Sequence, residues 1–182
     1  QDTSSAASDV YKRQVDDLGG KLQNWGYTES VLVDGDRVVC TPGGGDGAIV
    51  ALDKTTGKKL WACGDVTDNA QYSSIIPIDN SGQRQYVQLF QSTLAGVDAE
   101  SGDLAWRTNW EGKVAVIPTP IHHDGHIYIA SGYKNGCKLV KLDGGSAEDV
   151  YTNDVMVNHH GGVVLVAVSY THLLAHETAM DL

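Results

Sequence analysis

An aspartate recurs every 45 residues, at positions 53, 98 and 143, and an aromatic ring follows each aspartate eight residues later, at positions 61, 106 and 151. The surrounding stretches read "ALDKTTGKKLW" over 51–61, "GVDAESGDLAW" over 96–106 and "KLDGGSAEDVY" over 141–151. A fixed period of about 40–50 residues is typical of repeat proteins in which each repeat is one supersecondary unit. We therefore divide the chain into units at 27–70, 71–115 and 116–160, with a further unit starting at 161–166.

Each unit predicts four short strands and no helix, because Val, Ile, Leu and Tyr cluster in short runs that turn residues separate. The predicted strands are 30–33, 37–41, 48–53 and 58–62 in the first unit, 73–78, 85–90, 93–98 and 103–108 in the second, and 116–121, 126–131, 137–143 and 149–152 in the third. "VDGD" at 33–36, "DNSG" at 79–82 and "HHDG" at 122–125 are the corresponding turns between first and second strands.

The recurring aspartate and ring have a physical explanation in this scheme. Asp53 and Asp98 end a third strand and can accept backbone N–H groups of the next turn, which Gly57 and Gly102 close with positive φ. Trp61 and Trp106 lie on the fourth, outermost strand, where a large ring can wedge against the next sheet. Four-stranded sheets repeated around an axis are the blades of a β-propeller, an all-β fold.

The third unit departs from this pattern. It keeps Asp143 and has Tyr151 in the ring position, but it lacks the Thr-Gly or Ser-Gly turn, so we expect a weaker contact there. The predicted structural docking set is Asp53, Gly57, Trp61, Asp98, Gly102, Trp106, Asp143 and Tyr151.

Composition excludes two classes of function. The formal net charge of −10 repels nucleic-acid phosphates, and no Lys/Arg cluster offsets it. No apolar run reaches the length of a transmembrane helix. At 182 residues, the chain is long enough for one domain with a substantial core.

Both ends of the chain match none of the repeats. "SSAASDVYKRQ" at 4–14 and "VSYTHLLAHETAMDL" at 168–182 resemble translated sequencing-adapter DNA at the ends of environmental protein predictions. We therefore predict non-native tails at 1–14 and 167–182 around a propeller region at 15–166, and we expect the native signal region to be missing. His172 and His176 have helical i, i+4 spacing beside Glu177, but Met180 replaces the second His of the HExxH pattern, so no metal site is predicted.

The pattern A-x-D-x-x-[TS]-G-x-x-x-W in the first two units resembles the repeat of PQQ-type (pyrroloquinoline quinone, quinoprotein-like) β-propellers and its tryptophan-docking motif. "NWGYTESVLVDGDRVVCTPGGGDGAIVALDKTTGKKLW" and "NHHGGVVLV" resemble secreted planctomycete-type proteins related to polyvinyl-alcohol dehydrogenase or to the assembly lipoprotein BamB. The resemblance covers about residues 22–166 and implies a periplasmic, secreted or cell-envelope protein. Family propellers have about seven or eight blades, so we expect a fragment with about three blades and the start of a fourth.

Two functions follow from this resemblance. The first is a non-catalytic scaffold or binding module, without a cofactor, whose loops or axial face bind a protein or a small ligand. The alternative is a fragment of a PQQ-dependent alcohol or sugar dehydrogenase, which in that family uses PQQ, Ca²⁺, an adjacent Cys-Cys disulfide, a stacked Trp and an Asp base. This chain has no Cys-Cys pair, and Trp25 and Trp110 are its only tryptophans outside the docking positions. We therefore assign no catalytic or metal residue and favour the non-enzymatic function.

The remaining candidate residues favour structural roles. Cys40, Cys63 and Cys137 are odd in number, and a bond between the first two stays open. "TPGGGDGA" at 41–48 and "TGKK" at 56–59 are interpreted as turns rather than phosphate sites, and Asp79, Asp124 and Asp154 as turn residues rather than Ca²⁺ ligands. His122 with His123, and His159 with His160, are adjacent pairs that would point to opposite faces of a strand. For His159 and His160 a place at the axial mouth of the propeller is the alternative to a structural role.

Overall fold

The structure, a computed structural model, describes residues 14–165 and contains three antiparallel sheets of four strands each. The first sheet comprises β1 (Leu32–Asp34), β2 (Arg37–Cys40), β3 (Val50–Asp53) and β4 (Lys59–Ala62). The second comprises β5 (Ile76–Asn80), β6 (Gln83–Leu89), β7 (Thr93–Asp98) and β8 (Leu104–Asn109). The third comprises β9 (Ile121–His123), β10 (His126–Ser131), β11 (Gly136–Asp143) and β12 (Ser146–Asn153). Strands pair in chain order within each sheet, which confirms the all-β prediction.

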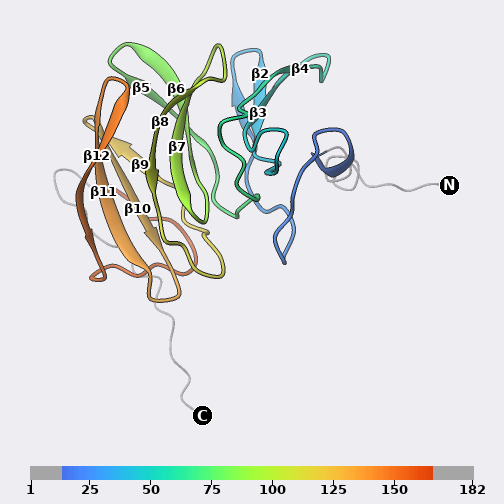
Figure 1. Cartoon of the computed structure of the whole chain (residues 1–182). Coiled ribbons are helices and arrows are strands. Elements are labelled where there is room, and N and C mark those ends of the chain that lie inside the picture. Colours follow the sequence, from blue (N-terminus) through green and yellow to red (C-terminus); the bar gives the residue numbers. More distant parts are fainter. Residues whose placement is uncertain (1–13, 166–182) are drawn as a thin grey trace.

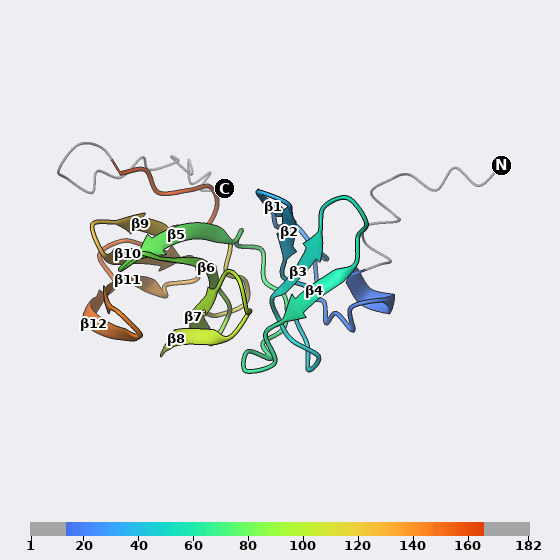
Figure 2. The same cartoon turned by 90° about the horizontal axis from the view of Figure 1, so that it is seen from above.

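The three sheets stand side by side in chain order, as blades of a β-propeller do (Figure 1). The first strands β1, β5 and β9 lie on one side of the molecule, and the fourth strands β4, β8 and β12 lie on the other (Figure 2). We call the side of β1, β5 and β9 the axial side. Residues 161–165, where the sequence predicts the start of another blade, carry no strand. The predicted tails lie outside the described residues, except for Gln14, which is buried.

All three first strands begin later than the sequence predicts, and the first blade's begins at Leu32 rather than at 30. The third blade's first strand is Ile121–His123 rather than 116–121, since Pro118 and Pro120 have no N–H to donate to a ladder. The second blade's first strand is Ile76–Asn80 rather than 73–78. Ser73 precedes this strand, and its hydroxyl donates to the Pro118 carbonyl at 3.1 Å. The hairpin turns are also shorter than predicted, so Asp79 and His122 belong to strands rather than to turns.

Alternating side chains of the middle blade bury both of its faces. On β6, Tyr86 belongs to the apolar cluster shared with the first blade, which includes Val39, Ile49 and Ala51. The next residue, Val87, belongs to the cluster shared with the third blade, which includes Ile127 and Val140. The core of this molecule therefore consists of layers between blades, because a single sheet cannot bury its own faces.

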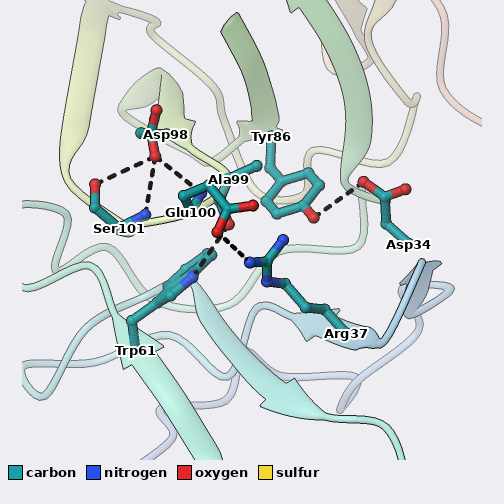
Figure 3. Close-up of polar contacts among 8 residues, drawn as sticks. All are labelled: Asp34, Arg37, Trp61, Tyr86, Asp98, Ala99, Glu100 and Ser101. Atoms are coloured by element: carbon teal, nitrogen blue, oxygen red, sulfur yellow. Dashed lines mark hydrogen bonds and ion pairs between the residues drawn. The ribbon is translucent and has the colours of Figure 1, made fainter.

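Trp61 connects the first blade to the second (Figure 3). Its indole Nε1 donates to the carbonyl of Ala99 at 3.3 Å, and its ring stacks on Tyr86 with centroids 6.2 Å apart. The ring also covers Gly102: a Cβ at that position would lie 2.5 Å from indole carbons. Gly102 has φ +78°, so both the backbone conformation and the close approach favour glycine.

Asp98 shapes the turn on which Trp61 lies. Its Oδ1 accepts the N–H groups of Glu100 and Ser101 at 2.8 and 2.9 Å, and the Ser101 hydroxyl at 3.3 Å. These hydrogen bonds favour the charged form and lower the pKa of Asp98, with the Ser101 N–H as the main cause. The turn is therefore fixed from within its own blade before the neighbouring indole packs on it.

Charged residues surround this contact. Arg37 of the first blade pairs with Glu100 of the second, and Asp34 pairs with Arg84 at 3.1 Å. The Tyr86 hydroxyl donates to Asp34 at 3.0 Å (Figure 3). The hydrogen bond from Arg84 is the main reason that the pKa of Asp34 is lowered. Burial and then Asp34 raise the pKa of Tyr86 to about 12, so its hydroxyl keeps its proton and remains a donor.

The second and third blades meet through a different set of polar contacts. Trp106 Nε1 donates to Gln85 Oε1 at 2.8 Å, within its own blade. Asn80 then reaches the third blade, where its amide donates to the carbonyl of Gly144 at 2.8 Å. Lys138 of the third blade, almost fully buried, reaches back to the Asn109 carbonyl at 2.7 Å and to Asp149 of its own blade at 2.6 Å. Side chains thus replace the direct indole-to-carbonyl bond of the first contact.

Each ring lies beside a β-bulge. The pairing of third and fourth strands shifts between Ala51 and Leu52, between Gly96 and Val97, and between Leu139 and Val140. The residues opposite Trp61, Trp106 and Tyr151 are those that directly precede each shift. A bulge changes the direction of the side chains on its strand. Because the bulge recurs at the same place in each blade, the three rings have the same position relative to it.

Replacing Gly102 by Ala will destabilise the chain more than replacing Gly82 by Ala. Both glycines have positive φ, +78° and +82°, but a Cβ on Gly82 meets nothing within 4 Å. Gly82→Ala should therefore cost only the left-handed strain of about 1–2 kcal/mol, and Gly102→Ala should cost about 1–3 kcal/mol more through its clash with Trp61. Urea unfolding measures both free energies. If the two variants lose the same free energy of unfolding, the close contact between Trp61 and Gly102 is contradicted.

Replacing Gln85 by Met will leave two buried donors, Trp106 Nε1 and one Asn80 N–H, without this acceptor. We expect a loss of about 1–3 kcal/mol in the free energy of unfolding, which is the usual cost of an unsatisfied buried donor. Gln83→Met, at an exposed position of the same strand, is the control. A loss no larger than that of the control would show that Trp106 does not depend on Gln85.

Acid will selectively weaken the Asp98 turn. A carboxyl whose pKa is lowered by folding stabilises the fold above its unfolded pKa of about 3.9, and this stabilisation disappears as pH falls through the folded pKa. Asp98→Asn keeps an acceptor oxygen but does not titrate. The stability difference between wild type and this variant should therefore narrow below about pH 4. Asp103→Asn, at an exposed position of the same turn, is the control, and a difference that widens in acid would contradict the predicted sign.

Candidate functional site on the axial side

The residues of the predicted docking set lie at third-to-fourth-strand turns and on fourth strands. Asp53 repeats the turn of Asp98: its Oδ1 accepts the N–H groups of Thr55 and Thr56 at 3.0 and 2.6 Å, and Gly57 has φ +68°. Asp143 instead precedes a two-residue turn and pairs directly with Ser146. Tyr151, on β12, is 37% exposed, compared with 3% for Trp106. Of this set, Trp61 and Gly102 meet between the first two blades, and Trp106 lies in the apolar cluster between the second and third. The set brings no chemically reactive groups together.

A cavity of about 430 Å³ lies where the chain enters the first strands of the blades. It is lined by Trp25, Thr28, Tyr72, Ala115, Ile117, Tyr133 and His160. We call this the axial pocket. Trp25, Ala115 and His160 occupy the same position of the 45-residue repeat, as do Tyr72 and Ile117. Residues at equivalent positions of different units therefore meet at one place.

Two groups of rings form the pocket. In the first, the Trp25 and Tyr72 rings meet at 58° with centroids 5.8 Å apart, and the backbone N–H of Trp25 donates to the Tyr72 hydroxyl oxygen at 3.3 Å. In the second, His159 lies 4.2 Å from Tyr133 and stacks on His160 at 4.6 Å. Trp25 is 59% exposed and Tyr72 only 7%, so the indole lies near the mouth of the pocket and the phenol deeper.

The backbone around Tyr133 is adapted to this arrangement. Tyr133 has φ +57°, in the left-handed region that non-glycine residues rarely adopt. A Cβ on the preceding Gly132 would lie 2.9 Å from the Cα of His159, so the two segments approach as closely as glycine allows. The position of the Tyr133 and His159 rings therefore depends on a tight loop after β10.

The lining of the axial pocket does not fit PQQ. That cofactor carries three carboxylates, which require cationic partners, and its Ca²⁺ requires oxygen ligands from acidic or amide groups. The seven lining residues include no Lys, Arg, Asp, Glu, Asn or Gln. Among residues 14–165, no group of three or more His, Cys, Asp and Glu side chains could hold a metal ion. We therefore derive no chemical step through PQQ at this pocket.

A second cavity, of about 380 Å³, is lined by Asp34, Gly35, Asp36, Arg37, Asp53, Leu60 and Arg84. Its two arginines are already paired across the blades, Arg84 with Asp34 and Arg37 with Glu100. Asp34 and the two arginines thus belong to the blade contact described above, whereas Asp53 is bound within its own turn.

The other candidates from the sequence do not form a site. Cys40, Cys63 and Cys137 are buried free thiols in the structure, and burial raises the pKa of Cys40 to about 12, which keeps it protonated and unreactive. His122 and His123 are adjacent on β9, and burial lowers the pKa of His122. Trp110 is buried in the apolar cluster between the second and third blades.

The sequence analysis singled out two of the pocket's residues, Trp25 and His160, without assigning either of them to a ligand site. It separated Trp25 from the docking tryptophans and placed His159 and His160 at the axial mouth as one alternative, but it missed Tyr72 and Tyr133. Extending the 45-residue register upstream from the Asp and Trp motif would have aligned Trp25 with Ala115 and His160. No other residue that lines the pocket occupies the repeat position of Tyr133, so the repeat could not have pointed to it.

A family model matches most of the chain. The family model described as outer membrane protein assembly factor BamB, a PQQ-like repeat model, matches residues 17–176. Among solved structures, BamB from Moraxella catarrhalis is similar at 23% identity and a TM-score of 0.46, covering 70% of this chain and 37% of that one. Quinohemoprotein alcohol dehydrogenase from Comamonas testosteroni is similar at 17% identity and a TM-score of 0.48, covering 78% of this chain and 24% of that one.

This chain thus spans well under half the length of either solved structure. No curated protein sequence matches it significantly. Within residues 14–165, no helix is long and apolar enough to cross a membrane. The family match over most of its length, together with three consecutive four-stranded blades, shows that the chain belongs to the PQQ-like β-propeller family whose model bears the BamB description.

Proposed function

We propose that this chain is a non-catalytic binding module, a propeller scaffold that presents its axial side to a small ligand or a protein partner. The observation that carries this proposal is the axial pocket, a ring-lined cavity of about 430 Å³. Concave apolar pockets with a few polar groups are the usual form of a ligand site.

The same lining argues against catalysis at this pocket. Acid–base or nucleophilic chemistry needs a titratable group held by a second polar group within hydrogen-bond reach. The lining offers only His160 and the hydroxyls of Thr28, Tyr72 and Tyr133, and His160 stacks on the neighbouring His159. The pocket is therefore suited to binding rather than to proton transfer.

Family membership supports a place in the cell envelope or outside the cell. The matching family model is described as an outer membrane protein assembly factor, and we propose a periplasmic, secreted or envelope location on that basis. A protein-binding role on the loops or the axial face rests on the same relationship.

The proposal predicts no quinoprotein activity. The chain would be titrated with PQQ and Ca²⁺ while quinone absorbance is recorded together with dye reduction by simple alcohols. We expect neither saturable quinone binding nor dye reduction, because the pocket provides no partner for the cofactor's carboxylates. Saturable binding with alcohol-dependent dye reduction would overturn the proposal in favour of a PQQ-dependent dehydrogenase.

A further inference from the structure

We propose that the axial pocket binds a quaternary ammonium group, of the kind found in choline. This inference rests on the proposed binding function and names its ligand class. It depends on three properties of the pocket: aromatic rings line it from two separate groups, hydrogen-bond acceptors are scarce, and the chain is strongly acidic.

The rings supply the attraction. The face of an aromatic ring carries negative potential and attracts cations, and indole does so most strongly. Trp25, Tyr72 and Tyr133 all line the same cavity. Since Trp25 and Tyr72 meet at 58°, they form a corner rather than a parallel slot. A corner suits a rounded group such as trimethylammonium, whereas a flat aromatic ligand would need two parallel faces.

The scarcity of acceptors selects the type of cation. A primary ammonium brings three N–H donors and a guanidinium five, and each donor that is buried without a partner costs free energy. The lining contains no carboxylate or side-chain amide, and the Tyr72 hydroxyl oxygen already accepts the backbone N–H of Trp25. The Thr28 and Tyr133 hydroxyls and His160 are the remaining side-chain acceptors of the lining, too few for the donors of a guanidinium. A quaternary ammonium has no N–H group, so it can enter this pocket without losing hydrogen bonds to water that it cannot replace.

The charge of the chain favours the same class. A net charge of −10 attracts cations over a long range and repels anions, including carboxylates and phosphates. Sugars are disfavoured for another reason: their many hydroxyls need the carboxylate, amide and guanidinium partners that the lining lacks. A cation that is recognised by ring faces is therefore the class that fits both the pocket and the chain.

The test compares choline with its neutral carbon analogue dimethylbutanol, in which a tert-butyl group replaces trimethylammonium at almost the same size. Isothermal titration calorimetry on the full chain measures both affinities, and ethanolamine serves as the primary-amine control. We expect choline to bind at least about tenfold more tightly than either compound. If dimethylbutanol binds as tightly as choline, or if choline does not bind, the inference is overturned.

Variants locate the site. Trp25→Leu removes the exposed indole and should weaken choline binding about tenfold, while Trp25→Phe keeps a ring face and should retain part of the affinity. Val33→Ser, an exposed change on β1 outside the pocket lining, should bind choline like wild type. Far-ultraviolet circular dichroism checks that each variant folds. Choline binding that Trp25→Leu leaves unchanged would place the site elsewhere and overturn the inference.

Two further arms separate the outcomes. Co-sedimentation with phosphatidylcholine vesicles, but not with phosphatidylglycerol vesicles, would support the inference and identify a lipid headgroup as the source of the ligand. If free choline binds but vesicles do not, the inference is also supported, and the natural ligand is a soluble compound rather than a lipid. Failure of the proposed function has a separate readout, PQQ-dependent dye reduction, so it can be distinguished from failure of the ligand class.

Discussion

The close contact between an indole on one blade and a glycine turn on the next is the interaction on which the first two blades depend. A four-stranded sheet of this size exposes two faces, and stability requires that neighbouring sheets cover them. Trp61 covers the surface over Gly102, and the Arg37–Glu100 and Asp34–Arg84 pairs surround that contact. The Trp61 ring thus lies at the centre of a contact that joins the apolar faces of the first two blades and the ion pairs around them.

The second and third blades cover their facing surfaces in a different way, because the turn between the third and fourth strands of the third blade is shorter. Where the first two units have a longer Asp-stabilised turn, the third has only Gly144 and Gly145 between Asp143 and Ser146. Gln85 and Asn80 connect Trp106 to the Gly144 carbonyl, and the buried Lys138 adds a second link. Loss of the turn sequence is therefore accompanied by a hydrogen-bonded network, as buried polar groups require.

The period of 45 residues was sufficient to predict the fold class and the four strands of each blade, because hydrophobic alternation and turn residues are local signals. It could not predict that β9 starts at Ile121, since that depends on which residues Pro118 and Pro120 leave available for pairing. It also missed the bulges beside each ring, which depend on pairing with a neighbouring strand. The Tyr72 and Tyr133 walls of the axial pocket were missed because loops bring them together from different units.

The contact between Trp61 and Gly102 can be tested most directly by nuclear magnetic resonance. An indole over a glycine Cα shields the Hα protons and lies close enough to give cross-relaxation with them. The structure predicts nuclear Overhauser effects between the Trp61 ring and the Gly102 Hα protons, with at least one Hα shifted strongly upfield. If these effects are absent in spectra that show the contact between the Trp61 and Tyr86 rings, this account of how the blades are joined is contradicted.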